Sequence, residues 1–190
     1  MHSFMNDYDE GAHPRILKAL SDTNAAQTHG YGLDSYSDKA RELIKEAIGA
    51  GGADIHFIPG GTLANLIAAS AFLKPYEAVV SAVTGHIEVH ETGAVESTGH
   101  KIIGVAAPDG KLRPHDVKTV LDLHTDEHMV KPRLVYISDT TELGTVYSKA
   151  ELEYLSAFCR EYKLLLYLDG ARLGSALCCS DVTLEDIARF

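Results

Sequence analysis

The amino-acid sequence predicts a three-layer α/β fold, in which helices cover both faces of a mostly parallel β-sheet. Helical patterns alternate with short apolar runs, which is the order that parallel sheets with crossover helices produce. Two of these runs, 134–138 and 164–168, are almost wholly apolar, as expected for strands that are covered on both faces. The chain has 190 residues, 45% of them hydrophobic, and is therefore long enough for one such domain with a proper core.

The first part of the chain predicts two helices with a short strand between them. In residues 37–48 apolar side chains recur at three and four positions, which predicts an amphipathic helix with Ser37 as its N-cap. A strand is expected at 54–58 and an Ala- and Leu-rich helix at 62–72. The remaining strands are expected at 78–83, 101–106, 134–138 and 164–168.

The second part of the chain carries two helix starts. Ser148 and Glu151 have the spacing of a capping box, which predicts a helix from Ser148 to about Tyr162. Another helix is expected to begin at Thr183. No repeat, low-complexity tract or Pro/Ser-rich linker indicates an internal domain boundary. Ligands of parallel α/β sheets bind at the carboxyl ends of the strands, so candidate residues are sought there.

Composition and charge argue against several classes of protein. The formal net charge is −10, which disfavours nucleic acid and anionic membranes as partners. No apolar run is long enough to span a bilayer, and the first 14 residues lack the basic and apolar regions of a signal peptide. Cys159, Cys178 and Cys179 indicate neither a disulfide framework nor a zinc knuckle. We therefore expect a reduced, cytoplasmic protein.

The first candidate site is the glycine-rich turn Gly60-Gly61-Thr62, which lies between the strand expected at 54–58 and the next helix. Glycines allow backbone N–H groups to turn inward, and the helix start adds a partial positive charge, so this turn can hold a phosphate. The alternative is a tight structural turn with Thr62 as an N-cap. No lysine follows the glycines, which argues against a loop that binds a nucleoside triphosphate.

The second candidate is Asp169, at the carboxyl end of an apolar strand, with Arg172 three residues later. A carboxylate in that position is costly unless a cation pairs with it, and a protonated pyridine nitrogen is such a cation. Arg172 offers a planar fork that suits a substrate carboxylate. The alternatives are that Asp169 pairs with Arg172, or that it caps the next element.

The third candidate is His86, which follows the strand expected at 78–83 and can lay its ring over an aromatic cofactor. His90 lies four residues later, as on one face of a metal-binding helix, but Ile87 occupies the position where the zinc signature has glutamate. No third ligand is evident, and no metal ion is expected. Two weaker candidates, 140–147 and 31–34, supply hydroxyl groups and a tyrosine near the expected rim of the site.

Together these stretches resemble the low-specificity L-threonine aldolase (β-eliminating lyase) family of fold-type-I pyridoxal-phosphate enzymes. The resemblance extends over nearly the whole chain, and the joint order of the motifs is more specific than any one of them. The matching stretches are Asn6-Asp7, Gly30-Tyr31-Gly32 with Asp34, Gly61-Thr62 with Ala64-Asn65, His86-Ile87 with Glu91-Thr92-Gly93-Ala94, Asp109-Gly110-Lys111-Leu112, Thr141-Glu142 with Gly144-Thr145-Val146-Tyr147, and Asp169-Gly170-Ala171-Arg172-Leu173.

The resemblance implies the large domain of the pyridoxal-phosphate-dependent transferase fold, with pyridoxal 5′-phosphate as the cofactor. By this comparison Gly60, Gly61 and Thr62 would hold the cofactor phosphate. His86 would stack on the pyridine ring and Asp169 would pair with its nitrogen, and these two are the expected catalytic residues.

The same resemblance implies the substrate and the assembly. Arg172 would bind the carboxylate of an amino acid, L-threonine or L-allo-threonine, which the enzyme would cleave to glycine and acetaldehyde. Tyr31 would lie near the active site, often that of a neighbouring subunit, in a homodimer or homotetramer.

The sequence departs from the family pattern at three places. Asn6 stands where relatives have serine, and Thr140-Thr141 occupies a segment in which many aldolases have a histidine. The Schiff-base lysine of the family lies a short way beyond the position of Phe190, and Lys163 precedes a strand on the wrong side of the sheet to replace it. We therefore expect an N-terminal arm at 1–30, an incomplete large domain at 31–190, no C-terminal small domain, and an inactive chain.

Two alternatives to the aldolase stay open at this point. One is another pyridoxal-phosphate-dependent lyase or an aminotransferase on the same scaffold. The other is an inactive truncated fragment that only binds a partner chain.

Overall fold

A computed structural model describes residues 5–8 and 11–190 of the chain. The chain divides into two compact units, Met1–Glu42 and Leu43–Phe190. The division lies inside helix α2 (Ser35–Ala47) rather than after residue 30. The domain limits expected from the sequence stay a prediction.

The first unit contains helix α1 (Pro14–Thr23), which was not expected, and the start of α2. Pro14 occupies the first turn of α1, where its fixed φ angle favours a helix start. Asp34, not Ser37, caps α2: its Oδ1 accepts a hydrogen bond from the Ser37 backbone N–H at 2.9 Å. The helix therefore begins two residues before the expected position, because an aspartate carboxylate competes well for the first free N–H groups.

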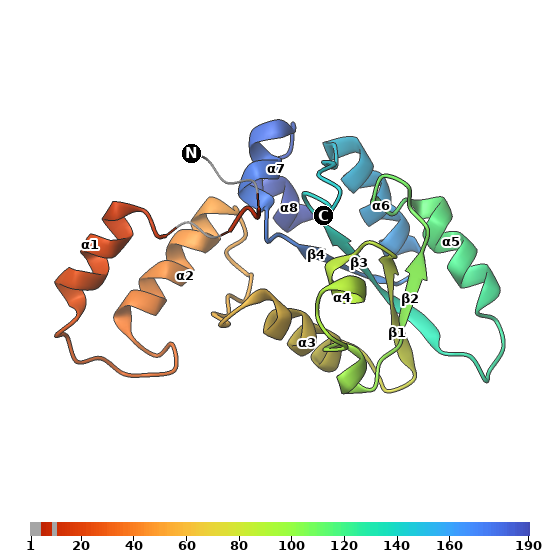
Figure 1. The fold of residues 1–190 in the computed structure, drawn as a ribbon, viewed down its shortest axis with the longest axis horizontal. Coiled ribbons are helices and arrows are strands. Elements are labelled where there is room, and N and C mark those ends of the chain that lie inside the picture. Colours follow the sequence, from red (N-terminus) through yellow and green to blue (C-terminus); the bar gives the residue numbers. More distant parts are fainter. Residues whose placement is uncertain (1–4, 9–10) are drawn as a thin grey trace. The chain divides into compact units, whose positions relative to one another are not determined.

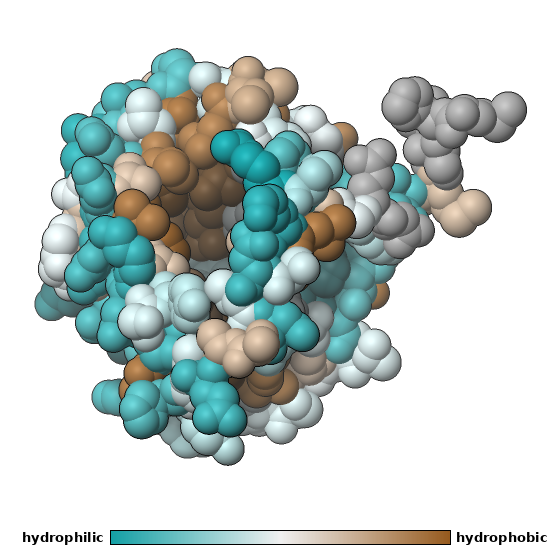
Figure 2. Space-filling model, turned by 90° about the vertical axis from the view of Figure 1, so that its left-hand side faces the viewer, coloured by the Kyte–Doolittle hydropathy of each residue, from teal (hydrophilic) through white to brown (hydrophobic). Residues whose placement is uncertain are grey.

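Neither α1 nor α2 buries a residue, although both have an apolar side. On α1 the exposed apolar side chains are those of Ile16, Leu17 and Leu20. Figure 2 shows apolar surface lying open beside hydrophilic surface on one face of the molecule.

The second unit is built on a four-stranded parallel sheet with the strand order β2-β1-β3-β4 (Figure 1). The strands are β1 (Glu77–Ala82), β2 (Ile102–Val105), β3 (Lys131–Ser138) and β4 (Leu165–Asp169). Each lies within a few residues of its expected position. Their parallel arrangement confirms the predicted sheet and brings all four carboxyl ends to one edge.

The strand expected at 54–58 is wrong, because these residues form no strand in the structure. A strand needs a hydrogen-bonded neighbour, and neither edge strand of the sheet, β2 or β4, pairs with this segment. The local sequence of the segment does not supply such a partner.

Two helical layers cover the sheet, which confirms the three-layer architecture. Helices α3 (Gly61–Phe72) and α4 (His86–Val89) lie on one face, where Ala69 and Ile87 pack against Val79, Leu134 and Tyr136. Helices α5 (Pro114–Leu123) and α6 (Lys149–Glu161) lie on the other face, where Val117 and Leu152 pack against Val80, Val135 and Ile137. Alternate residues of one strand therefore enter different cores, as the two-residue period requires.

The remaining elements are a short 3-10 turn, η1 (Glu96–Thr98), and the helices α7 (Leu173–Cys179) and α8 (Leu184–Arg189). Both expected helix starts are confirmed, since Ser148 begins α6 and Thr183 begins α8 with a capping box. No helix in the described part of the chain is long and apolar enough to cross a membrane.

Strand β4 is covered on both faces, as its apolar sequence predicted, but it is less buried than β3. All five of its residues are half-buried, whereas β3 is buried from Leu134 onward. Both faces of β4 contact helical layers, but it is an edge strand with only β3 beside it. The expectation that both strands are covered on both faces is therefore confirmed, although the edge position leaves β4 only half-buried.

Candidate active site

A cavity of about 210 Å³ lies at the carboxyl edge of the sheet. It is lined by Gly61, Thr62, His86, Glu91, Ser138, Thr140, Glu142, Asp169, Ala171 and Arg172. Five residues that the sequence analysis selected therefore face one cavity, from the start of α3, from α4, and from the turn after β4. Gly60 immediately precedes this lining. Tyr31 belongs to the first unit, is fully exposed there, and does not line the cavity.

The start of α3 forms the end of the cavity that suits an anion. Gly60 is the N-cap, with φ 102° and ψ 149°, a conformation that is essentially restricted to glycine. Thr62 is the second helical residue and not the N-cap that the sequence suggested, and no side chain caps this helix. The first N–H groups of the helix therefore remain available at its positive end. A phosphate fits this position.

Asp169, the last residue of β4, is fixed by three hydrogen bonds. Its Oδ2 accepts from the Tyr136 hydroxyl at 2.7 Å and from Asn65 Nδ2 at 3.3 Å. Its Oδ1 accepts from the backbone N–H of Ala171 at 3.0 Å, in the turn before α7 (Leu173–Cys179); because Arg172 is the N-cap of that helix, the alternative that Asp169 caps it is wrong. The carboxylate is thus held in place while it lines the cavity. Arg172 lines the same cavity and is the N-cap of α7.

Two tyrosines that were not expected from the sequence belong to this network: Tyr136 donates to Asp169, and Tyr167 donates to Asn65. Burial, together with the charge of Asp169, raises the pKa of Tyr136 far above its usual range. Burial, with Asp169 and Glu91 nearby, raises the pKa of Tyr167 to about 12. Both phenols therefore keep their protons and act as donors. Their rings stack at 5.7 Å between centroids. The sequence did offer a signal for these tyrosines: a hydroxyl group inside an apolar strand needs a hydrogen-bond partner.

His86 is the first residue of helix α4 and not part of a strand end. Its Nδ1 lies 2.8 Å from Oε1 of Glu91, whose side chain is completely buried. His90 is the C-cap of the same helix and does not line the cavity. Among residues 5–8 and 11–190, no group of three or more His, Cys, Asp or Glu side chains is placed to hold a metal ion.

Close packing requires a glycine at position 85, just before His86. A Cβ atom at this position would lie 2.3 Å from Ser81 Oγ and 3.0 Å from the carbonyl oxygen of Ala82. Because any larger residue would collide with β1, glycine lets α4 begin directly against the strand. This close approach places the imidazole at the cavity.

The remaining rim comes from the turn after β3, where Ser138, Thr140 and Glu142 line the cavity. The Ser138 hydroxyl donates to Glu142 Oε1 at 2.9 Å. The peptide bond between Asp139 and Thr140 is cis.

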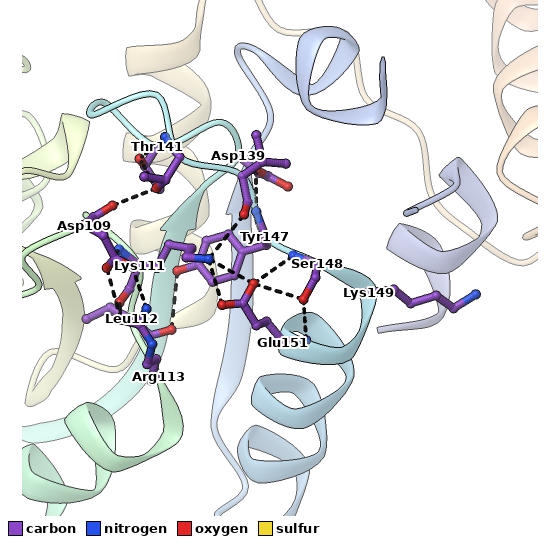
Figure 3. Close-up of polar contacts among 12 residues, drawn as sticks. Asp109, Lys111, Leu112, Arg113, Asp139, Thr141, Tyr147, Ser148, Lys149 and Glu151 are labelled. Atoms are coloured by element: carbon purple, nitrogen blue, oxygen red, sulfur yellow. Dashed lines mark hydrogen bonds and ion pairs between the residues drawn. The ribbon is translucent and has the colours of Figure 1, made fainter. Parts of the chain in front are cut away.

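A polar cluster behind the rim holds this turn (Figure 3). Lys111 Nζ donates to Glu151 Oε1 at 2.7 Å and to the carbonyl oxygen of Val146 at 3.3 Å. The Thr145 hydroxyl donates to the carbonyl oxygen of Asp109 at 2.7 Å. Hydrogen bonds therefore hold together the two loops that contain the motifs at 109–112 and 141–147. Their residues support the site from behind, apart from Glu142, which faces the cavity.

Charge is distributed unevenly in the cavity. Its lining includes three carboxyl groups, on Glu91, Glu142 and Asp169, and one guanidinium group, on Arg172. The helix start at Gly61 adds positive potential at one end. The arrangement therefore suits a ligand with an anionic group for the helix start and a protonated nitrogen for the acidic part.

The family model described as "Beta-eliminating lyase" matches residues 14–190 of the chain. The low specificity L-threonine aldolase of Pseudomonas aeruginosa is 33% identical over 175 residues, which are 91% of this chain and 50% of that protein. The enzyme of the same name from Escherichia coli K12 is 28% identical and aligns with 84% of this chain and 47% of its own length. The chain thus spans about half the length of these curated relatives.

A solved structure, titled as a structural analysis of Leishmania major threonine aldolase, superimposes on the whole chain with a TM-score of 0.97 and 54% sequence identity. The match covers 56% of that protein. The family resemblance and the α/β architecture that the sequence predicted thus agree with the fold of this solved structure.

Proposed function

Because this chain belongs to the β-eliminating lyase family, we propose that it forms the cofactor-binding part of a pyridoxal-phosphate-dependent threonine aldolase. One observation carries the proposal: a single cavity is lined by the helix start at Gly61, the imidazole of His86 and the carboxyl group of Asp169. These groups match the phosphate, the aromatic ring and the pyridine nitrogen of the cofactor. Had they faced different cavities, no single ring could contact all three.

The donors and acceptors of the cavity fit pyridoxal 5′-phosphate. The free N–H groups at Gly61 and Thr62, with the Thr62 hydroxyl, would bind the phosphate. Asp169 would accept a hydrogen bond from the protonated ring nitrogen. His86 would cover one face of the ring.

The bound cofactor would supply an electron sink for the electron pair of a breaking Cα–Cβ bond. Asp169 would keep the proton on the ring nitrogen, and the Tyr136 hydroxyl would hold the Asp169 carboxylate in line with it. His86 would exclude water from one ring face. Arg172 would bind the amino-acid carboxylate with two parallel N–H groups and so orient the bond that breaks.

The proposed substrates are L-threonine and L-allo-threonine. Loss of the β-hydroxyl proton and cleavage of the Cα–Cβ bond would release acetaldehyde, and return of a proton to Cα would give glycine.

We further propose that the 190 residues alone hold the cofactor without a covalent anchor and are inactive. No lysine is among the ten residues that line the cavity. Lys163 precedes β4, whereas Asp169 ends it, so the two lie at opposite ends of the strand.

We also propose that the protein assembles as a homodimer or homotetramer in which Tyr31 approaches a neighbouring site. We propose a cytoplasmic location as well, which the free thiols of Cys159, Cys178 and Cys179 support.

Pyridoxal phosphate added to the purified 190-residue chain tests the cofactor site. We expect saturable binding that is lost on gel filtration, and much weaker binding by Asp169→Asn, which keeps the shape of the side chain and removes its charge. Retention of a Schiff-base absorbance band after gel filtration, abolished by one lysine substitution, would overturn the absence of an anchor. Equal binding by Asp169→Asn would overturn the role of that carboxylate.

Acetaldehyde release tests the activity. If the reading frame continues after Phe190, the longer product should cleave L-allo-threonine or L-threonine, whereas the 190-residue chain should not. A longer product that binds the cofactor and releases no acetaldehyde from either amino acid would contradict the aldolase assignment.

A further inference from the structure

Glu91 is a buried carboxyl group beside the cavity that the proposed reaction does not use. Its side chain is 0% exposed. Two donors converge on Oε1, His86 Nδ1 at 2.8 Å and Asn65 Nδ2 at 2.6 Å. Burying an acidic group so completely is unfavourable unless its hydrogen bonds compensate. The location therefore indicates a specific task for Glu91.

The contact with Glu91 determines which nitrogen of His86 carries hydrogen. A carboxylate oxygen can only accept a hydrogen bond, so Nδ1 of His86 must donate. In the neutral ring, Nε2 is then the acceptor. The ring orientation is fixed by the same bond, because Glu91 is itself held from a second side by Asn65.

Asn65 connects Glu91 to Asp169. Its Nδ2 group reaches Glu91 Oε1 at 2.6 Å and Asp169 Oδ2 at 3.3 Å, and its Oδ1 accepts from the Tyr167 hydroxyl at 2.8 Å. The amide orientation is unambiguous, since the reverse orientation would turn its oxygen toward two carboxyl groups. Asn65 is 5% exposed, so water does not screen these contacts. One amide thus donates to both acidic groups and reduces their mutual repulsion.

We propose that Glu91 is a positioning residue that fixes the Nδ1–H tautomer and the ring orientation of His86, and that Asn65 couples it to Asp169. The imidazole that covers the cofactor ring and the carboxylate that meets its nitrogen are then set by one hydrogen-bonded unit. The inference rests on the proposed function for its purpose, but the tautomer is a property of the chain without any ligand.

Nitrogen NMR of the 190-residue chain labelled at histidine tests the tautomer. A His86→Gln variant identifies the His86 signals among those of the ten histidines. We expect the Nδ1–H form in the parent and in Glu91→Gln, which keeps an acceptor oxygen in the same place. Glu91→Leu removes that acceptor, and we expect His86 to shift toward the Nε2–H form. Glu88→Gln, an exposed substitution on the same helix, should match the parent.

Several results would overturn the proposal. If His86 of the folded parent carries its hydrogen on Nε2, the proposal is wrong. This result needs no variant, so the test does not depend on whether Glu91→Leu folds. A folded Glu91→Leu chain with the parent tautomer would also contradict it, and so would a Glu91→Gln chain with the tautomer changed.

Binding of pyridoxamine 5′-phosphate, which needs no lysine, separates this inference from the proposed function. We expect Glu91→Leu to bind it about tenfold more weakly than the parent, the effect of losing roughly one hydrogen bond, and Glu91→Gln to bind within about threefold of the parent. A parent that shows the expected tautomer and binds no pyridoxamine phosphate would contradict the function and leave the positioning of His86 intact. A parent that binds pyridoxamine phosphate while His86 lacks the Nδ1–H form would contradict the positioning of His86 and leave the proposed function intact.

Discussion

The hydroxyl group of Tyr136 donates to Oδ2 of Asp169 at 2.7 Å, from the middle of one strand to the end of its neighbour. The parallel register pairs Tyr136 with Tyr167 and Ser138 with Asp169, so the phenol reaches forward along the sheet to the carboxyl edge. The phenol stays protonated and can keep donating this bond, because burial and the nearby charge of Asp169 raise its pKa. Asp169 is therefore held before any ligand arrives.

Tyr136→Phe should lower the free energy of unfolding by about 1 kcal/mol, the usual contribution of one hydrogen bond. The ring and its stacking on Tyr167 are kept, so the change isolates the hydroxyl group. Urea unfolding measures the difference. Tyr154→Phe is the control, because Tyr154 is 67% exposed, and it should stay within about 0.5 kcal/mol of the parent. Equal stability of the two variants would contradict the importance of the Tyr136 bond.

Gly60→Ala should destabilise the chain by about 1–3 kcal/mol, because its φ of 102° is strained for any residue with a Cβ atom. Space is not the cause, since no atom lies within 4 Å of the added carbon. Gly61→Ala is the matched control: the site is equally open, but its φ lies outside the strained range, so stability should change by less than about 1 kcal/mol. Thermal unfolding of both variants checks this, and a Gly61→Ala loss as large as that of Gly60→Ala would rule out backbone strain as the cause.

Lys111→Met should destabilise the chain by about 1–3 kcal/mol, because it removes charged hydrogen bonds to Glu151 behind the site. The Lys111 side chain is only 13% exposed, so water cannot replace it fully. Lys118→Met breaks an exposed pair with Asp122 and should cost at most about 1 kcal/mol. Chemical denaturation of both variants gives the comparison. A larger loss for Lys118→Met would show that the cluster in Figure 3 does not hold the loops.

The sequence was sufficient to predict those parts of the fold that local rules determine. The strands β1, β3 and β4 each contain an apolar run, and the starts of α6 and α8 are capping boxes, so both kinds of element follow from neighbouring residues. Helix α5 was missed although Pro114 marks its first turn. The segment 54–58 was assigned wrongly, because a strand depends on a partner that no local pattern reveals.

The candidate site was predictable where a topological rule applied. Asp169 ends a strand and His86 follows one, and parallel strands bring such residues to one edge of the sheet. The network around them was not predictable, since Asn65 lies 104 positions from Asp169 and meets it only through the packing of α3 on the sheet. The buried Glu91 was visible in the sequence only as part of a matching motif, and only the folded structure shows its partners.

Stability should fall in acid, partly because of Asp186. Hydrogen bonds from Lys149 and from the Thr183 cap lower the pKa of Asp186 to about 2, whereas an aspartate in an unfolded chain titrates near a pKa of about 3.9. The unfolded chain therefore binds the proton first as the pH falls, so this contribution is complete above about pH 4 and is lost toward pH 2. Asp186→Asn should be less stable than the parent at pH 6, and the difference should shrink as the pH approaches 2. Urea unfolding at a series of pH values measures it, with the exposed Asp54→Asn as the control expected to follow the parent. A difference between Asp186→Asn and the parent that stays constant over this range would mean that the ionised carboxylate does not stabilise the start of α8.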